Sequence, residues 1–155
     1  MSASGGTGAI VRPFLPPDLP AVLDLCAEHA AYERSVFDRA SCAAGLATAL
    51  SAASPRLLCR VAEGDGIVGY ATATIDFSTW RAREFLHMDC LYVRAAQRGA
   101  GIGARLLAAL RDEARARGID EMQWQTPDWN AGAARFYRRL GASESTRLRY
   151  RLHLR

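Results

Sequence analysis

Apolar residues recur at the three- and four-residue spacing of an amphipathic helix in four parts of the chain. The residues at the ends of these segments support the same interpretation, because Asp18 precedes the first and the glycine Gly118 follows the third. The sequence therefore predicts four helices. The first helix begins after Asp18 and reaches Ala30, and the second covers 41–51. The third begins at the end of a glycine-rich loop and ends at Gly118, and the fourth covers 130–140.

Between these helices lie short, mostly apolar runs bounded by turn residues such as glycine and proline, which is typical of β-strands. The turn Glu63–Gly66 joins two of the runs into a predicted hairpin. Arg147, Arg149 and Arg151 alternate with apolar residues near the end of the chain, which predicts a half-buried strand with one solvated face. The predicted strands are 9–13, 57–62, 67–77, 84–93, 122–126 and 147–154. Their order with the helices predicts an α/β domain with a mixed sheet.

The 155 residues are enough for one domain with a substantial core, and half of them are hydrophobic. We expect a flexible N-terminus over 1–8 and a single domain over 9–155. Apolar runs stay shorter than the ~18–20 residues that span a bilayer, and residues 1–8 lack the basic and apolar regions of a signal peptide. The chain is therefore expected to be cytoplasmic, with no membrane partner.

All 20 residues of the Lys+Arg total are arginine, and the net charge is +4. The lack of lysine excludes a P-loop and a Schiff-base lysine. Because the arginines are dispersed among acidic residues, they indicate solvated helix faces rather than a nucleic-acid site. The four cysteines show no C-x-x-C spacing, so neither a metal site nor a disulfide framework is expected.

The segment Gln97–Gly103 is the first candidate ligand-binding site, and it lies between a predicted strand and a predicted helix. Its glycines would let an anion approach backbone N–H groups, and the positive end of the helix dipole would favour a pyrophosphate there. The run from Gly99 to Ala104 also fits the dinucleotide fingerprint G-x-G-x-x-[GA], but the acidic residue that this fold needs at the end of the next strand is replaced by Gln125-Thr126. A glycine turn that binds nothing is the third interpretation.

The pattern Arg98-x-x-Gly101-x-Gly103 resembles the pyrophosphate loop of the GNAT superfamily of N-acetyltransferases. The strand 89–93 and the segment 128–142 resemble the other cofactor-binding motifs of that superfamily, in the same order. The resemblance implies a mixed, mostly antiparallel sheet flanked by helices, with a splayed central strand pair holding acetyl-CoA, and by analogy a homodimer. The implied cofactor-binding residues are Leu91, Tyr92, Val93, Arg98, Gly99, Ala100, Gly101, Ile102, Gly103, Asn130 and Tyr137.

A narrower resemblance, to the spermidine/spermine acetyltransferase-like branch, rests on the segments 31–33, 77–80 and 129–130. The branch usually has Glu-Asp where this chain has Asp89-Cys90. The resemblance implies a primary amine on a small molecule as the acceptor, either a polyamine or an amino-acid-like amine. The candidate acceptor-binding residues are Glu28, Tyr32, Glu33, Trp80 and His87.

Direct acetyl transfer needs a base for the amine, whose pKa is ~10.4 if lysine is the model, and an acid for the departing thiolate. Tyr137 is the candidate acid, and it shares a helix face with Asn130, which could also cap that helix. Asp89 is the candidate base and His87 its rival. Strand alternation predicts that His87, Asp89 and Leu91 lie on one face.

Two other functions fit the same motifs. The chain could be a non-catalytic sensor that binds acyl-CoA, or an acetyltransferase of protein amines. The candidate acid and base favour an enzyme over a sensor. No metal is expected in the mechanism.

Overall fold

The computed structural model describes residues 8–155 of the chain. The chain divides into two compact units, Met1–Gln125 and Thr126–Arg155. The predicted flexible N-terminus 1–8 lies, apart from Gly8, outside the described residues. The prediction of one domain over 9–155 stays a prediction.

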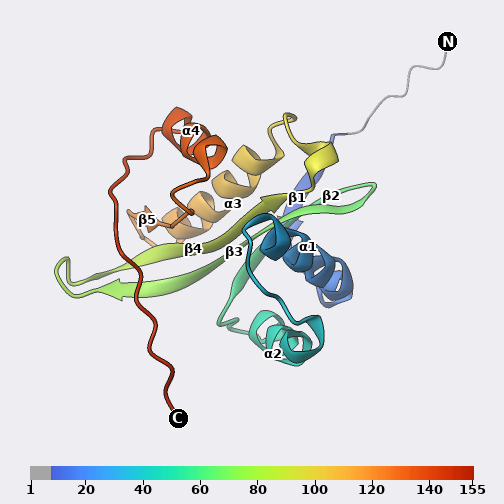
Figure 1. The fold of residues 1–155 in the computed structure, drawn as a ribbon, viewed down its shortest axis with the longest axis horizontal. Coiled ribbons are helices and arrows are strands. Elements are labelled where there is room, and N and C mark those ends of the chain that lie inside the picture. Colours follow the sequence, from blue (N-terminus) through green and yellow to red (C-terminus); the bar gives the residue numbers. More distant parts are fainter. Residues whose placement is uncertain (1–7) are drawn as a thin grey trace. The chain divides into compact units, whose positions relative to one another are not determined.

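The first unit is built on a five-stranded sheet whose spatial order equals its sequence order. The first four strands are antiparallel and the fifth is parallel to the fourth. This mixed, mostly antiparallel sheet confirms the predicted fold class (Figure 1). The strands are β1 (Ile10–Pro13), β2 (Leu58–Gly64), β3 (Gly66–Ser78), β4 (Arg83–Val93) and β5 (Met122–Gln123).

The two parallel strands pair over a very short length. Leu86 lies opposite Met122 and His87 opposite Gln123, and β5 ends there while β4 continues to Val93. The predicted strand 122–126 is therefore too long. Among the described residues, no strand pairs with this edge of β4 beyond His87, so its backbone polar groups there are left outside the ladder.

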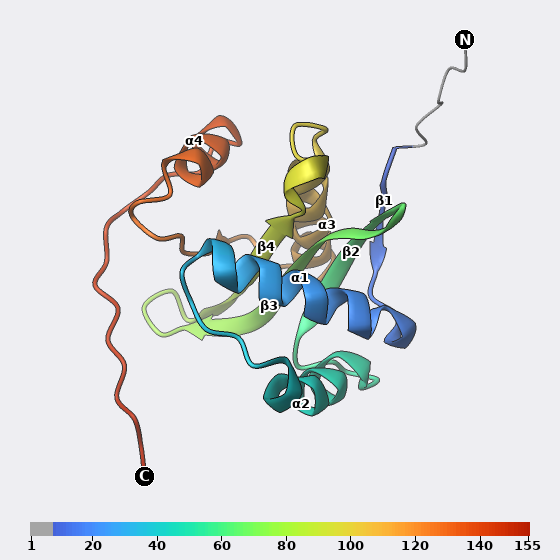
Figure 2. The same cartoon turned by 45° about the vertical axis from the view of Figure 1, so that its right-hand side comes forward.

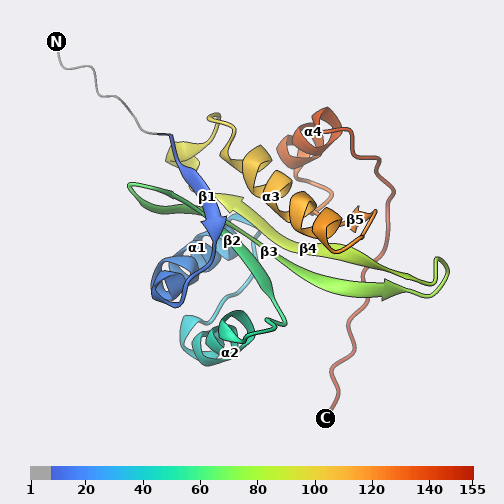
Figure 3. The same ribbon diagram turned by 180° about the vertical axis from the view of Figure 1, so that it is seen from behind.

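Helices cover both faces of this sheet (Figures 1, 2 and 3). Helices α1 (Leu19–Tyr32) and α2 (Arg39–Ser51) lie on one face, and α3 (Ile102–Ala116) lies on the other. The core under α1 and α2 consists of Val22, Leu25, Leu50, Cys59, Val61, Ile67, Tyr70 and Tyr92. On α3 an apolar stripe is buried against the sheet, with Leu106 and Leu110 completely buried.

A glycine sets the distance between α3 and the sheet. A Cβ on Gly69 in β3 would lie 3.0 Å from the Tyr92 carbonyl oxygen and 3.3 Å from a methyl carbon of Leu106. A side chain at this position would therefore push β4 and α3 away from β3.

The start of α1 differs from the prediction in one respect. Asp18 occupies the N-cap position, but its side chain makes no capping hydrogen bond. It forms a bidentate ion pair with Arg12 of β1, at 2.8 and 2.9 Å, and accepts a hydrogen bond from the Leu15 N–H. The reason is that a 3₁₀ turn, η1 (Pro16–Asp18), leads directly into α1, so the exposed N–H group to be satisfied belongs to Leu15. Asp18 thus ties β1 to α1.

The second unit contains α4 (Ala131–Arg139), which confirms the predicted helix to within one residue at each end. The predicted last strand is wrong, because no strand forms among the described residues after α4 (Figure 1). The four alternating apolar side chains are 78–86% exposed rather than half-buried. A strand needs a neighbour to complete its hydrogen bonds, and this segment has none within the described chain. These apolar residues are Leu148, Tyr150, Leu152 and Leu154.

Candidate functional site

The glycine-rich segment forms a tight loop between β4 and α3. A short 3₁₀ turn, η2 (Ala95–Gln97), follows β4, and the chain then turns through Gly99 and Gly101, whose φ angles are +85° and +75°. Only glycine adopts such angles without strain. Gly101 is the N-cap of α3 and supplies no capping side chain. The first N–H groups of α3 are therefore left for another acceptor, as an anion site requires.

Arg98 anchors this loop to the rest of the first unit. Its Nε donates a 2.8 Å hydrogen bond to the carbonyl oxygen of Val93. Its guanidinium carbon lies 5.0 Å from the ring centre of Tyr32 on α1 and 5.2 Å from that of Tyr92 on β4. These are cation–π distances. Arg98 thus brings a positive charge to the point where the loop, β4 and α1 meet.

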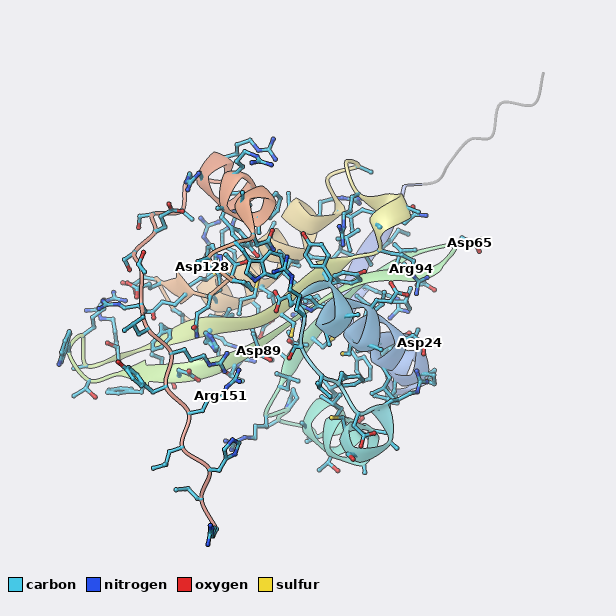
Figure 4. The ribbon with its side chains drawn as sticks, viewed as in Figure 1. Asp24, Asp65, Asp89, Arg94, Asp128 and Arg151 are labelled. Carbon is cyan, nitrogen blue, oxygen red and sulfur yellow. The ribbon has the colours of Figure 1, made fainter. Side chains whose placement is uncertain are left out.

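A β-bulge interrupts β4 at Asp89. Cys90 lies opposite Thr72 and Met88 lies opposite Ala73, so Asp89 has no partner on β3. An extra residue reverses the side-chain alternation beyond it. His87 therefore shares a face with Cys90, and the prediction that it shares one with Leu91 is wrong. Figure 4 shows Asp89 along β4.

The bulge leaves the Asp89 side chain exposed. Its carboxylate accepts a weak hydrogen bond from the thiol of Cys90, at 3.7 Å. Burial, followed by the charge of Asp89, raises the pKa of this thiol to about 12, so Cys90 stays protonated. The carboxylate itself remains open to solvent and to a ligand.

The two predicted acceptor-binding acids lie at the C-terminal end of α1, and they differ in their partners. Glu28 forms an ion pair with Arg94 at 3.2 Å, and the Tyr92 hydroxyl donates to it at 3.3 Å. Figure 4 shows Arg94 near the end of β4. Glu33 instead lies 3.3 Å from the ring of His29. The structure therefore brings Glu28, Tyr32 and Glu33 together beside the end of β4.

His29 is a residue that the sequence interpretation did not select. Its ring stacks on Tyr92, with centroids 5.1 Å apart, and one nitrogen lies 3.0 Å from the Tyr70 hydroxyl. A single histidine among the apolar positions of α1 is not distinguishable from a core residue in the sequence. The one available signal was its i,i+4 spacing to Glu33, which places the two side chains on one helix face.

Three other predicted site residues belong to the β3–β4 turn or to the second unit. Trp80 lies in the β3–β4 turn, is 98% exposed, and is not brought to the α1 group, since the hairpin extends away from α1 (Figures 1 and 3). Asn130 and Tyr137 belong to the second unit. The Asn130 side chain accepts a 3.2 Å hydrogen bond from Ala133 N–H, which confirms its capping role. The Tyr137 ring contacts Phe136 edge to face. The catalytic and ligand-binding roles of all these residues stay predictions.

Helices among residues 8–155 are all too short or too polar to cross a membrane. Comparison with solved structures gives the fold. An aminoglycoside N-acetyltransferase in complex with CoA superposes with a TM-score of 0.81 at 20% identity, covering 98% of this chain and 99% of that one. An aminoglycoside acetyltransferase from an uncultured soil sample, in complex with trehalose, gives a TM-score of 0.77 at 20% identity, covering 95% and 97%.

Two curated relatives are similar in sequence. The thialysine N-epsilon-acetyltransferase of Bos taurus is 31% identical over 84 residues, which cover 54% of this chain and 49% of that protein. The chain thus matches about half the length of that relative. The L-methionine sulfoximine/L-methionine sulfone acetyltransferase of Pseudomonas aeruginosa is 32% identical over 132 residues, covering 80% of this chain and 74% of that protein.

The family model described as the acetyltransferase (GNAT) family matches residues 21–142, which include most of α1, the glycine loop and α4. This match covers most of the chain and agrees with the fold and with the loop geometry. The resemblance to the GNAT superfamily is therefore confirmed, and the chain belongs to the GNAT family of acetyltransferases.

Proposed function

We propose that the protein is an acetyl-CoA-dependent N-acetyltransferase that transfers the acetyl group directly to a primary amine of a small molecule. The observation that supports this most strongly is the loop before α3. Gly99 and Gly101 hold it in a conformation that leaves helix N–H groups without a capping side chain, next to an edge of β4 outside the ladder. Both features suit a long ligand that carries a pyrophosphate.

The residues present fit acetyl-CoA. The loop and the start of α3 would hold the pyrophosphate through backbone N–H groups, and the β4 edge beyond His87 offers backbone groups to the pantetheine amides. When bound, the cofactor supplies the activated acetyl thioester. The residues proposed to hold it are Leu91, Tyr92, Val93, Arg98, Gly99, Ala100, Gly101, Ile102, Gly103, Asn130 and Tyr137.

In the proposed mechanism, Asp89 accepts a proton from the acceptor ammonium, and the bulge that exposes its carboxylate supports this role. His87 is the alternative base, since a histidine titrates closer to neutral pH. Tyr137 donates a proton to the sulfur of the departing thiolate. The deprotonated amine would then receive the acetyl group, and the thiol would leave with the proton from Tyr137.

The proposed acceptor is a cationic small-molecule amine, either a polyamine or an amino-acid-like amine. The acidic end of α1, with Glu28 and Glu33 beside Tyr32, supports a cation, and His87 is the remaining proposed acceptor-binding residue. Relatives named for thialysine and for L-ornithine support the amino-acid-like choice, because both substrates carry a side-chain amine.

An amine panel tests the proposal. The purified protein is incubated with acetyl-CoA and thialysine, ornithine, spermidine or methionine sulfoximine, and the release of free thiol is measured. We expect turnover with at least one cationic amine. CoA binding without turnover of any amine would instead support the sensor function, and acetylation of peptide amines alone would support an enzyme acting on proteins.

We also propose that the protein forms a homodimer. The exposed apolar residues after α4 alternate with arginines as in a strand, and a second copy could supply the missing neighbour. Light scattering is expected to give the mass of a dimer for the wild type. Replacing Leu148 and Leu152 by serine is expected to give a monomer, and a dimer that persists in this variant would contradict the proposed interface.

A further inference from the structure

His29 packs against aromatic side chains of the first unit. It lies on α1, its side chain is 13% exposed, and its ring stacks on Tyr92 with an interplanar angle of 20°. Tyr70 meets the same ring edge to face, with centroids 6.0 Å apart. The ring orientation is therefore fixed by packing before any hydrogen bond is considered.

The hydrogen-bond partners of the ring define which nitrogen carries the proton. Nδ1 lies 3.0 Å from the Tyr70 hydroxyl oxygen, and Nε2 lies 3.3 Å from a carboxylate oxygen of Glu33. An ionised carboxylate can only accept a hydrogen bond, so Nε2 carries the hydrogen and Nδ1 accepts from Tyr70. Burial raises the pKa of Tyr70 far above its usual range, which keeps its hydroxyl proton available for donation.

The charged groups around the ring come from several elements. Glu33 is the C-cap of α1, Asp89 lies on β4, and Arg98 lies at the start of the glycine loop. Burial is the largest influence and lowers the pKa of His29, Arg98 lowers it further, and the two carboxylates partly oppose them. The imidazole is therefore neutral at pH 7.

A neutral partner leaves Glu33 with its full negative charge. Glu28, five residues earlier on α1, is compensated by the guanidinium of Arg94. Glu33 is fixed by a hydrogen bond donor that carries no charge, and its side chain is 35% exposed. A carboxylate that is held in place, accessible and uncompensated by its partner is suited to receive a cation from solution.

We propose that His29 is a positioning residue of the acceptor site: its Nε2–H, backed by Tyr70 on the other side of the ring, holds the Glu33 carboxylate in the orientation that receives a cationic acceptor. The proposal rests on the proposed acetyl transfer and adds a residue to its acceptor site. It also predicts that acceptor binding weakens at low pH. Protonation of His29 would place a positive charge beside the Glu33 carboxylate, which has to attract the cationic acceptor.

A matched pair of variants tests this role. His29→Gln keeps an N–H donor near the Nε2 position and cannot become charged, whereas His29→Leu keeps apolar volume and has no donor. The probe is the cationic panel amine that the wild type acetylates fastest, with thialysine tried first. We expect His29→Leu to raise KM about tenfold, the effect of one lost hydrogen bond to a charged group, with kcat and CoA affinity little changed. His29→Gln should restore KM at pH 8.

The pH profile gives the second measurement. The wild-type KM is expected to rise as the pH falls through the lowered pKa of His29, which lies below the ordinary value of ~6.5, and this rise should be absent in His29→Gln and retained in the control His153→Gln. Thermal melting and CoA binding show whether each variant is folded. A folded His29→Leu with wild-type KM, or a His29→Gln whose KM keeps the wild-type pH profile, would overturn the role of His29. A wild type that acetylates no amine would overturn the proposed function itself, and the acceptor site with it.

Discussion

The cofactor side and the acceptor side of the proposed site are built from different kinds of chemical group. On the cofactor side, backbone groups dominate: Gly99 and Gly101 shape the loop, α3 offers its first N–H groups, and β4 offers an edge. On the acceptor side, side chains dominate, and Glu33 depends on His29, which depends on Tyr70. A backbone site is specified by local conformation, whereas a side-chain site is specified by tertiary packing.

This difference explains why a short motif identifies the cofactor side and why no comparable motif identifies the acceptor side. It also predicts that substitutions on the two sides will separate in their effects. Changes in the loop should alter CoA affinity, and changes around α1 should alter the acceptor KM.

The largest effect is expected at Tyr137, which belongs to the second unit and is the proposed acid. Tyr137→Phe removes one hydroxyl and keeps the ring that contacts Phe136. A positioned general acid contributes ~10²–10⁴-fold, so kcat is expected to fall within that range while CoA affinity stays near wild type. Steady-state kinetics with isothermal titration of CoA checks this result. Wild-type turnover would remove Tyr137 from the mechanism, whereas a parallel loss of CoA affinity would indicate a binding role.

The next effect concerns the loop. Gly101→Ala places a Cβ at a φ of +75°, which costs ~1–2 kcal/mol in the left-handed region. If the loop relaxes out of this conformation, CoA should bind about tenfold more weakly, since ~1.4 kcal/mol corresponds to a factor of ten.

Gly66→Ala is the matched control. Gly66 lies in the β2–β3 turn at a φ of +74°, and a Cβ there, like one on Gly101, meets no atom within 4 Å. Both variants should lose similar stability in thermal melting, and only Gly101→Ala should lose CoA affinity. Equal CoA affinity in the two variants would show that the loop conformation does not matter for the cofactor.

A smaller effect is expected at the junction of β1 and α1. The hydrogen bonds from Arg12 hold the pKa of Asp18 below its usual value, so the carboxylate stabilises the fold above pH ~3.9, and this contribution is lost as the pH falls through the lowered pKa. Asp18→Asn should cost about 1–3 kcal/mol at neutral pH and reduce the acid dependence of stability. Urea unfolding at pH 7 and pH 3 measures both, and an unchanged pH dependence would contradict the ion pair's contribution.

The smallest effect concerns His29. Its folded-state pKa is lowered by burial, so the unfolded chain binds this proton more readily, and stability should decrease as the pH falls below ~6.5. In His29→Gln this part of the decrease should be absent. Thermal melting between pH 7 and pH 5 tests it, with His153→Gln as the control that should follow the wild type.

Much of the fold could be predicted because local signals and tertiary structure agree. The stripe on α3 and the turn at Gly66 are examples, and so is the Asn130 cap. The start of α2 was placed two residues late, because its N-cap is Asp38, whose carboxylate accepts from Ala40 and Ser41 N–H. That signal was present in the sequence, since aspartate before a helix is a common cap.

Other features depend on contacts that a sequence pattern does not contain. The bulge at Asp89 adds one residue to β4, and strict alternation placed His87 on the wrong face. Asp18 was expected to cap a helix, but its carboxylate instead accepts a hydrogen bond from Arg12, six residues earlier. The segment after α4 has a strand pattern without a strand, because alternation predicts which side chains share a face and cannot supply a neighbour.

The most direct test of the comparison is to measure the CoA dissociation constant and the acceptor KM for both Gly101→Ala and His29→Leu in the same buffer. The proposed division predicts that Gly101→Ala weakens CoA binding and leaves the acceptor KM near wild type at saturating acetyl-CoA, and that His29→Leu does the reverse. If each folded variant changes both constants by similar factors, the two sides do not act separately, and the division between a backbone site and a side-chain site is contradicted.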